Sequence, residues 1–302
     1  MASRLRDRIG FAVSRVRRLT LSSRDRELLA LGDYAERDLL PRNLPPDEPS
    51  SRFIPSTRFA DFGLDFNIPG QLERLKRWGQ DYQHLFGTLR ADPSINVEFP
   101  GENYLHNRFY PTPDAETYAA MISDVRPARI VEVGSGFSTL IARRSIEFGG
   151  LRTTITAIDP SPRADVSGAA DRVLLSCIED VDIHEIGITQ DDMLFIDSSH
   201  VCRGRGDVPF LYCNIIPRLP SGTMVHVHDV FLPYDYPVVF LKRGYTEQYL
   251  LYSTLLHSDR YEIVFTAHYM SRTHPKDMQA TFGPTVGVHN RFFGASLWFR
   301  VK

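Results

Sequence analysis

A short apolar run that ends in two closely spaced glycines constrains this chain more than any other feature. Residues 129–138 have the sequence RIVEVGSGFS, and apolar residues return at helical spacing from Phe137 onward. Because glycine lacks a Cβ atom, Gly134 and Gly136 permit both a tight turn and the close approach of a ligand to the backbone. The pattern predicts a buried strand, a glycine turn and a helix, which together form a nucleotide-type cradle.

The glycine turn differs from the fingerprint of dinucleotide-binding folds. That fingerprint is Gly-x-Gly-x-x-Gly, and Thr139 stands at its third glycine position here. With the acid Glu132 before the turn, the order Glu-x-Gly-x-Gly resembles the first motif of class I S-adenosylmethionine-dependent methyltransferases. The resemblance implies that a carboxylate and the glycine backbone hold the methionine part of that cofactor, whereas in the alternative the glycines serve packing alone. The cofactor-binding residues expected in this segment are Glu132, Gly134, Ser135, Gly136 and Ser138.

Acidic residues follow the next two predicted strands. A β-rich run over residues 153–158 leads to Asp159, about two dozen residues after the glycine turn. The ribose diol is held at this place in both cofactor classes, so Asp159 is expected to bind ribose or, alternatively, to cap the Asp-Pro-Ser-Pro turn. Residues 172–175 predict a third strand. Glu179 follows it, where the methyltransferase arrangement places the adenine edge of the cofactor.

Two further predicted strands end in clusters of polar residues. One apolar run ends at Asp197 and His200, and the next ends in a His-Val-His-Asp sequence that begins at His226. Ligands of open α/β sheets collect at the carboxyl ends of the strands, so Asp197 is expected to face the cofactor. His226 and His228 lie two residues apart and therefore share one face of the strand. We expect His226 to be a hydrogen-bonded core residue, and His200 and His228 to belong to the site.

These two polar strand ends carry the most specific resemblance in the chain. The segments 195–201 (FIDSSHV) and 217–230 (PRLPSGTMVHVHDV) are similar to a bacterial group of class I methyltransferases, most of them functionally unassigned, and more distantly to sugar and macrolide O-methyltransferases. The similarity covers about residues 104–267 and implies S-adenosylmethionine and methyl transfer, with the acceptor left open. The expected fold is α/β, with a Rossmann-like doubly wound sheet, mostly parallel, that closes with an antiparallel hairpin of residues 260–267 and 295–301.

The strand-end histidines suit the chemistry that the resemblance implies. Methyl transfer requires an acceptor atom in line with the methyl carbon and a base that takes the proton of the acceptor. Histidine titrates near neutral pH, so His200 or His228 is expected to act as that base without a large change in pKa. Asp229 is the third expected catalytic residue. The predicted reaction is O-methylation of a small hydroxylated acceptor, such as a sugar or a natural product, and transfer to nitrogen stays open.

A divalent metal ion is a second ligand to consider at these strand ends. Some relatives in the broader superfamily hold an ion with an acid after the fourth strand and an acid pair after the fifth. The corresponding residues here are Asp197, His228 and Asp229, so a histidine replaces one acid. Magnesium sites are rich in oxygen, whereas manganese, iron or zinc accept such a mixed set. The alternative is a hydrogen-bonded Asp–His pair that orients the base.

Residues beyond the fifth predicted strand are expected to shape the acceptor pocket. Residues 231–237 form an aromatic and proline-rich loop, and residues 268–293 form an insertion that either covers the acceptor or is a disordered loop. A surface turn and a capped helix are the structural alternative for the polar residues near this loop. The polar acceptor contacts expected are Tyr110, Tyr234, Glu247 and Gln248.

The chain divides into three predicted parts. Residues 1–40 form an amphipathic N-terminal extension, and its first 20 residues contain six arginines. Residues 41–115 hold a linker rich in Pro, Asp and Ser and then an accessory helix over 70–86. Residues 116–302 form the methyltransferase domain. The arginine-rich helix either lies on an anionic membrane surface or docks on its own domain or on a second subunit, which leaves a homo-oligomer open.

The overall composition narrows the class of partner. A formal net charge of −2 over 302 residues comes with no strongly basic domain, so nucleic acid is not expected as a substrate. Cys177, Cys202 and Cys213 lack CxxC spacing and fall in predicted core elements, which indicates a reducing cytoplasm. No apolar run suits a secretory signal or a membrane span. An NAD-linked oxidoreductase and a non-catalytic membrane-peripheral or scaffold protein with the same fold are the alternatives from other classes.

Overall fold

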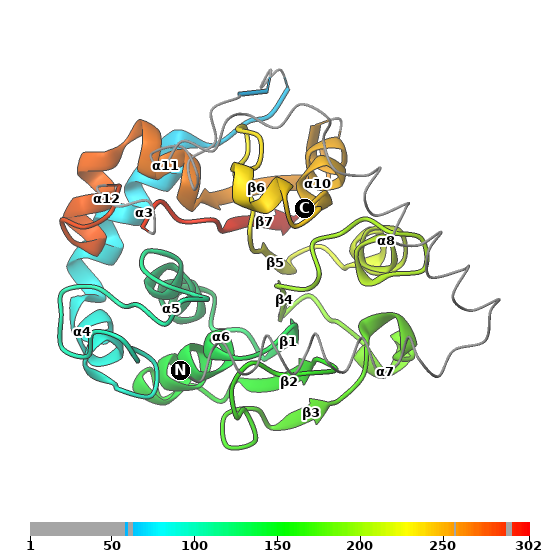
Figure 1. Cartoon of the computed structure of the whole chain (residues 1–302), viewed down its shortest axis with the longest axis horizontal. Coiled ribbons are helices and arrows are strands. Elements are labelled where there is room, and N and C mark those ends of the chain that lie inside the picture. Colours follow the sequence, from blue (N-terminus) through cyan, green and yellow to red (C-terminus); the bar gives the residue numbers. More distant parts are fainter. Residues whose placement is uncertain (1–57, 60–62, 257, 288–291) are drawn as a thin grey trace, which may run out of the picture.

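A seven-stranded sheet forms the centre of the molecule (Figure 1). The computed structural model describes residues 58–59, 63–256, 258–287 and 292–302, so the predicted extension 1–40 lies outside them. The strands are β1 (Arg129–Val133), β2 (Thr154–Ile158), β3 (Arg172–Leu174), β4 (Asp192–Ile196), β5 (Met224–Val227), β6 (Tyr261–Thr266) and β7 (Leu297–Val301). Their order is β3-β2-β1-β4-β5-β7-β6; the first five pair in parallel, and β7 is antiparallel to both of its neighbours. The expected mostly parallel sheet with a C-terminal antiparallel hairpin is confirmed.

Helices cover both faces of this sheet. They are α3 (Ile68–Asp81), α4 (Gln83–Ala91), α5 (Asp114–Val125), α6 (Phe137–Phe148), α7 (Ile183–Ile186), α8 (Asp207–Phe210), α9 (Val238–Leu241), α10 (Glu247–Leu256), α11 (Ala267–Thr273) and α12 (Pro275–Phe282). Alternate residues of each strand enter two separate cores. Ile130 and Phe195 pack with α5 and α6, whereas Val131 and Leu194 pack with Leu251 of α10 and its neighbours. The continuous apolar runs in β1 and β4 therefore reflect burial on both faces.

The prediction of a single accessory helix over 70–86 is wrong in one respect, because the structure has two helices there, α3 and α4. Helix α3 ends at Tyr82, whose φ and ψ of −116° and 11° lie outside the helical range. The hydroxyl of Tyr82 donates to Asp124 Oδ1 at 2.8 Å, and the indole Nε1 of Trp78 donates to Asp124 Oδ2 at 2.8 Å. The end of α3 is thus fixed against α5 by a carboxylate 42 residues away, which no local pattern encodes.

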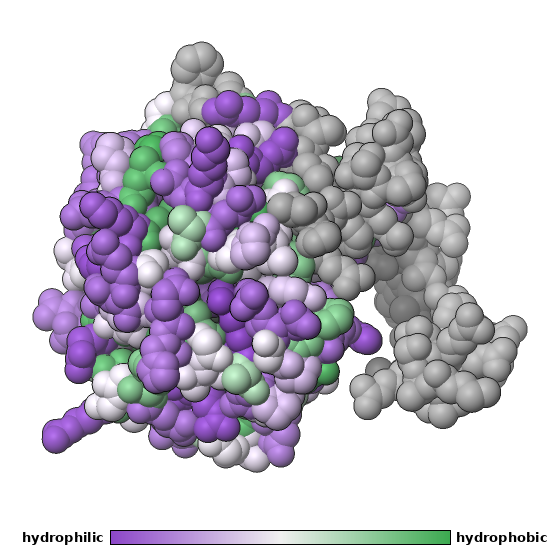
Figure 2. All heavy atoms as spheres, turned by 90° about the vertical axis from the view of Figure 1, so that its left-hand side faces the viewer, coloured by the Kyte–Doolittle hydropathy of each residue, from purple (hydrophilic) through white to green (hydrophobic). Residues whose placement is uncertain are grey.

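The segment 268–293 contributes two helices, α11 and α12, and residues 288–291 within it lie outside the described part of the chain. Helix α12 packs on α3, where Thr281 Oγ1 donates to the carbonyl of Leu75 at 3.0 Å. Figure 2 shows the face of the molecule on which α3, α4 and α12 lie, and hydrophilic side chains cover most of it. Among the described helices, none combines the length and the apolar character that a membrane crossing requires.

The prediction that all three cysteines lie in core elements is wrong. Cys177 is half-buried, while Cys202 and Cys213 are exposed. Cys202 lies in the loop after β4, and Cys213 lies on the outer side of a π-helical turn, Leu211–Ile215, whose Leu211 and Ile215 face the core. The chain therefore presents two thiols to solvent, and burial of cysteines gives no argument about the redox compartment.

Candidate functional site

The glycine turn after β1 meets the end of β4 at very short range. Gly134 has φ +83°, and a Cβ atom built there would lie 1.9 Å from the carbonyl oxygen of Asp197. No side chain fits that space, and the positive φ disfavours every residue with a Cβ. Glycine is therefore required at position 134 by the neighbouring strand. The same contact places the turn directly beside the polar end of β4.

Glu132, the penultimate residue of β1, places a fully buried carboxyl group beside this turn. Its Oε2 accepts a hydrogen bond of 2.5 Å from the hydroxyl of Thr139, which in turn accepts from the backbone N–H of Gly136 at 3.0 Å. Its Oε1 has no hydrogen-bond partner among the described residues. Burial raises the pKa of Glu132 to about 8. Thr139, which replaces the third glycine of a dinucleotide fingerprint, thus holds the turn closed through its side chain.

The predicted ribose ligand, Asp159, links two turns at the end of β2. Its Oδ2 accepts from the backbone N–H of Ser135 at 2.6 Å, and its Oδ1 accepts from the N–H of Ser161 at 2.7 Å. The capping role that we considered as the alternative is therefore present, on the same carboxylate that borders the glycine turn. Glu179 is half-buried in a 3₁₀ turn after β3, and its Oε2 has no hydrogen-bond partner within the described ranges. Ser138, the remaining predicted cofactor ligand, is buried at the start of α6.

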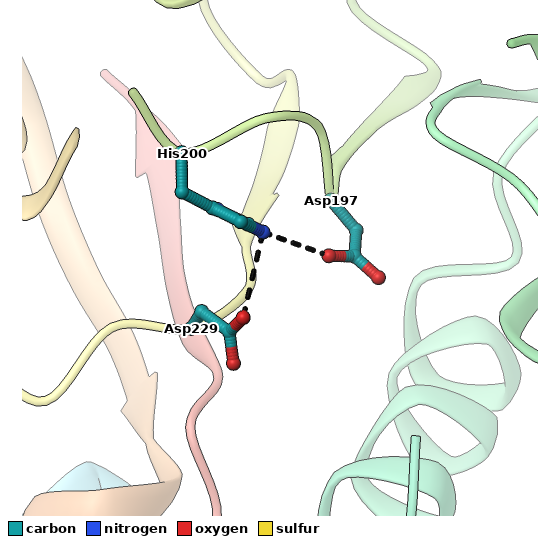
Figure 3. Close-up of side chains that lie close together, drawn as sticks. All are labelled: Asp197, His200 and Asp229. Atoms are coloured by element: carbon teal, nitrogen blue, oxygen red, sulfur yellow. Dashed lines mark hydrogen bonds and ion pairs between the residues drawn. The ribbon is translucent and has the colours of Figure 1, made fainter. Parts of the chain in front are cut away.

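Three side chains converge at the ends of β4 and β5 (Figure 3). The Nε2 atom of His200 lies 3.1 Å from Asp197 Oδ1 and 3.5 Å from Asp229 Oδ2. One potential ligand atom from each of these residues lies within 4.8 Å of the other two, which is close enough for one metal ion. Both His200 and Asp229 have positive φ, of +61° and +53°. Such strained positions are characteristic of functional sites. The histidine in this set is His200, whereas the sequence indicated His228.

His228 lies beside the same cluster, although in a different role. Its Nδ1 is 3.4 Å from Asp197 Oδ1 and 3.6 Å from Asp229 Oδ1, and its Nε2 is 3.7 Å from Asp114 Oδ2. The ring of Tyr110 packs on it with a centroid separation of 4.7 Å. Neither ring nitrogen makes a hydrogen bond to a described residue. The side chain is nevertheless buried, so His228 is a polar group within reach of three carboxylates but firmly bonded to none.

These carboxylates change the acid–base behaviour that we expected of the histidines. Burial opposes a charged ring, but hydrogen bonds to Asp197 and Glu247 together with the charge of Asp229 raise the pKa of His200 to about 10. The charges of Asp197 and Asp229 likewise overcome burial and raise the pKa of His228 well above its usual value. Against the effect of burial, both histidines hold the pKa of Asp197 well below its usual range. These shifts argue against the expected titration near neutral pH, because the neighbouring carboxylates raise the pKa of both rings.

His226 is a core residue, as expected from the sequence. It is fully buried, and its Nε2 lies 3.2 Å from the hydroxyl of Tyr110 and 3.0 Å from Ser296 Oγ. Burial holds the pKa of His226 well below its usual value. Tyr110 was expected to contact the acceptor. The structure places it between the core histidine and His228, fully enclosed, so its ring forms one wall of the cluster.

The other predicted acceptor residues occupy different places around the cluster. Tyr234 is half-buried, and the guanidinium carbon of Arg272 lies 4.1 Å from its ring centroid. Gln248 is buried and accepts from the backbone N–H of Phe231 at 3.0 Å, so it fixes the loop after β5. Glu247 is buried against His200, at 2.8 Å. The structure thus brings Glu247 into the cluster, places Tyr234 on the adjoining loop, and has Gln248 hold that loop from α10.

Sequence reasoning missed Asp114, which approaches the cluster from the start of α5. Its carboxylate accepts from the backbone N–H groups of Ala295 and Ser296, at 2.8 and 3.1 Å, and lies near His228. It therefore ties the segment before β7 to the site. An acid in the first turn of a helix is ordinarily explained by the helix dipole, so the sequence offered no means of recognising this contact.

Comparisons with known proteins agree with this architecture. Residues 131–230 match a family described as "Methyltransferase domain". An uncharacterized protein of Archaeoglobus fulgidus is 38% identical over 101 residues, which is 33% of this chain and 44% of that protein. The chain thus matches less than half the length of this curated relative.

Solved structures similar to this chain include several methyltransferases. A Podospora anserina methyltransferase bound to SAH is 14% identical, with a TM-score of 0.41, over 87% of this chain and 100% of that one. A putative O-methyltransferase from Klebsiella pneumoniae is 13% identical, with a TM-score of 0.44, over 76% and 99% of the two chains. The family match spans the glycine turn and the polar ends of β4 and β5, so residues 131–230 are similar to a methyltransferase domain in the part of the sheet that holds the candidate site.

Proposed function

We propose that this protein transfers a methyl group from S-adenosylmethionine to a hydroxyl oxygen of a small acceptor, such as a sugar or a natural product. One observation carries the proposal. A buried cluster of carboxylates and histidines lies at the carboxyl end of β4 and β5, directly against the glycine turn through the contact of Gly134 with Asp197. Cofactor cradle and acid–base groups are therefore neighbours, as a transfer between two bound molecules requires.

The residues of the turn fit the cofactor that the domain implies. The unpartnered Oε1 of Glu132 is a buried acceptor suited to the cationic amino group of a methionine moiety. Asp159 and Glu179 would hold the ribose and the adenine edge, with Ser135, Gly136 and Ser138 lining the turn. S-adenosylmethionine, when bound, supplies a methyl group on a positively charged sulfur that is a good leaving group. The chain itself has to hold the acceptor in line and to receive its proton.

The cluster supplies groups for that proton. His200 and His228 are the candidate bases, and Asp229 is the carboxylate that both approach. Because the neighbouring carboxylates raise the pKa of both rings and so favour their protonated forms, a base role requires that one ring first gives up its proton. Burial raises the pKa of Glu247, so this carboxylate is suited to share that proton, while Asp114 and Asp197 also lie near the two rings.

A bound divalent ion, instead of protonated histidines, is the other way to balance the negative charge of these carboxylates. The donor set of Asp197, Asp229 and one imidazole fits manganese, iron or zinc better than magnesium. His200 supplies that imidazole by its position, and His228 lies next to it. A bound ion would supply Lewis-acid chemistry. The alternative remains the pair of hydrogen-bonded carboxylate and histidine side chains without an ion.

Methyl transfer is tested directly with S-adenosylmethionine carrying a labelled methyl group and a panel of sugars, phenols and amines, each with manganese or with chelator. The proposal expects label on an oxygen of at least one hydroxylated compound and loss of transfer in Asp229→Asn. Label on amines alone would refute O-methylation. Label retained in Asp229→Asn would remove this cluster from the reaction.

The cellular placement of the protein is part of the same proposal. We propose a cytoplasmic enzyme whose residues 1–20 contact an anionic membrane surface or a second subunit. Co-sedimentation of the full chain with vesicles containing anionic lipid, compared with a variant lacking residues 1–20, tests the membrane contact. Equal sedimentation of the two proteins would exclude it, and their elution in size-exclusion chromatography with light scattering gives the oligomeric state.

A further inference from the structure

We propose that Glu247 is a positioning residue for His200: it fixes the imidazole so that its Nε2 atom faces Asp197 and Asp229. The inference deepens the proposed function and rests on it for the catalytic consequence alone. The orientation itself follows from contacts of described residues and has its own test.

The contact joins two buried side chains that are distant in the sequence. His200 Nδ1 lies 2.8 Å from Glu247 Oε2, and the exposed fractions of the two side chains are 3% and 0%. A carboxylate oxygen accepts, so Nδ1 of the ring carries the proton in this hydrogen bond. At this burial both partners are shielded from bulk solvent. The ring orientation is thus decided by Glu247.

The carboxylate is not needed to hold α10 against the loop after β4. The backbone N–H groups of Thr246 and Glu247 both donate to the carbonyl of His200, at 2.8 and 3.1 Å. The N–H of Cys202 donates to Thr246 Oγ1 at 2.7 Å. These three bonds dock the start of the helix on the loop without any contribution from the side chain of Glu247. What the carboxylate adds to this docking is its hydrogen bond to the imidazole, beside an interaction with the buried Tyr212.

The bond at Nδ1 also sets the position of the other ring nitrogen, Nε2. With Nδ1 directed to Glu247, Nε2 lies 3.1 Å from Asp197 and 3.5 Å from Asp229. A ring turned over by 180° would present carbon atoms to these carboxylates. Tyr245 packs against the ring with a centroid separation of 4.7 Å and limits its tilt. A carboxylate that orients one nitrogen so that the other can bind a metal or exchange a proton is a common arrangement, and its loss costs about 10–100-fold in affinity or activity.

The test uses the nearly isosteric variant Glu247→Gln in the full chain, labelled with ¹⁵N-histidine. Long-range ¹H–¹⁵N spectra report which ring nitrogen carries a proton and how strongly it is hydrogen-bonded, and the His200 signals are assigned by their loss in His200→Asn. We expect a proton on Nδ1 in the wild type, shifted downfield and slow to exchange with water. In Glu247→Gln the signal of the Nδ1 proton should move upfield, and this proton should exchange faster with water. Thr254→Val is the matched control, because it removes a side-chain bond within α10 that does not touch the loop.

Turnover gives the second readout. With the acceptor identified under the proposed function, kcat should fall about 10–100-fold in Glu247→Gln while the KM for S-adenosylmethionine changes less than about twofold. Unchanged His200 signals in folded Glu247→Gln would overturn the inference. If that variant does not fold, the wild-type spectrum decides alone, since an Nδ1 proton that is absent, or that lies upfield and exchanges rapidly with water, would overturn it equally. A shifted spectrum with no turnover on any acceptor would retain the positioning role and reject the proposed function.

Discussion

Replacing Gly134 with alanine should destabilise the protein more than the same change at any glycine in open space. The added Cβ would lie 1.9 Å from the carbonyl oxygen of Asp197, and the residue has φ +83°. A left-handed conformation costs a residue with a Cβ about 1–2 kcal/mol, and overpacking against a fixed neighbour costs about 1–3 kcal/mol more. We therefore expect Gly134→Ala to lower the free energy of unfolding by about 2–5 kcal/mol.

Gly150→Ala is the matched control for this prediction. Gly150 also has positive φ, +56°, but nothing lies within 4 Å of a Cβ built there. It should lose only the conformational part, about 1–2 kcal/mol, and the effect of alanine on the unfolded chain is the same in both variants. The difference between them isolates the contact between the β1 turn and the end of β4.

Urea unfolding followed by circular dichroism measures this difference. With an m value of about 3 kcal/mol/M, the urea midpoint of Gly134→Ala should fall by about 0.7–1.7 M, and that of Gly150→Ala by about 0.3–0.7 M. S-adenosylmethionine should bind at least about 10-fold more weakly to Gly134→Ala alone. Equal stability losses in the two variants would refute the close approach of Gly134 to Asp197 and, with it, the adjacency of cradle and cluster.

Three further predictions follow from single groups. The raised pKa of Glu132 means that the folded protein keeps a proton that the unfolded chain loses near pH 4.5. The free energy of unfolding should therefore fall by about 1 kcal/mol per pH unit between about pH 5 and 8. Glu132→Gln should flatten this dependence on pH, measured by urea unfolding at several pH values. Asp124→Ala should cost about 2–4 kcal/mol of stability, because it leaves the buried indole of Trp78 and the half-buried hydroxyl of Tyr82 without their acceptor; a loss below about 0.5 kcal/mol would contradict this. Manganese binding, followed by electron paramagnetic resonance, should weaken at least about 10-fold in Asp197→Asn, whereas Asp165→Asn, at an exposed turn, should bind as the wild type does.

The strands could be predicted from the sequence because their patterns are local. The central strands β1, β4 and β5 are short, mostly apolar runs that end in glycine or in acidic and histidine residues, and burial of the parallel sheet on both faces favours apolar residues in such strands. The core position of His226 was predicted for the same reason. Its spacing from His228 fixed the strand face that the two histidines share, and the expected hydrogen bonds of His226 are present.

The parts that could not be predicted depend on contacts between distant residues. The break between α3 and α4 depends on Asp124, and the high pKa of His200 depends on carboxylates from β5 and α10. Glu247 was expected at the acceptor because of its polarity alone. Its bond to His200 spans 47 residues and arises only when α10 docks on the loop after β4. Local periodicity contains no information on such pairs.

The central claim is that the β1 turn holds S-adenosylmethionine. Calorimetric titration of the full chain with S-adenosylmethionine and with NAD, each with and without chelator, tests it most directly. We predict one site for S-adenosylmethionine, at least about 10-fold weaker in Asp159→Ala and in Glu132→Ala, and no binding of NAD. Binding of NAD without S-adenosylmethionine would contradict the account in favour of an oxidoreductase, and binding of neither would leave a scaffold protein with this fold.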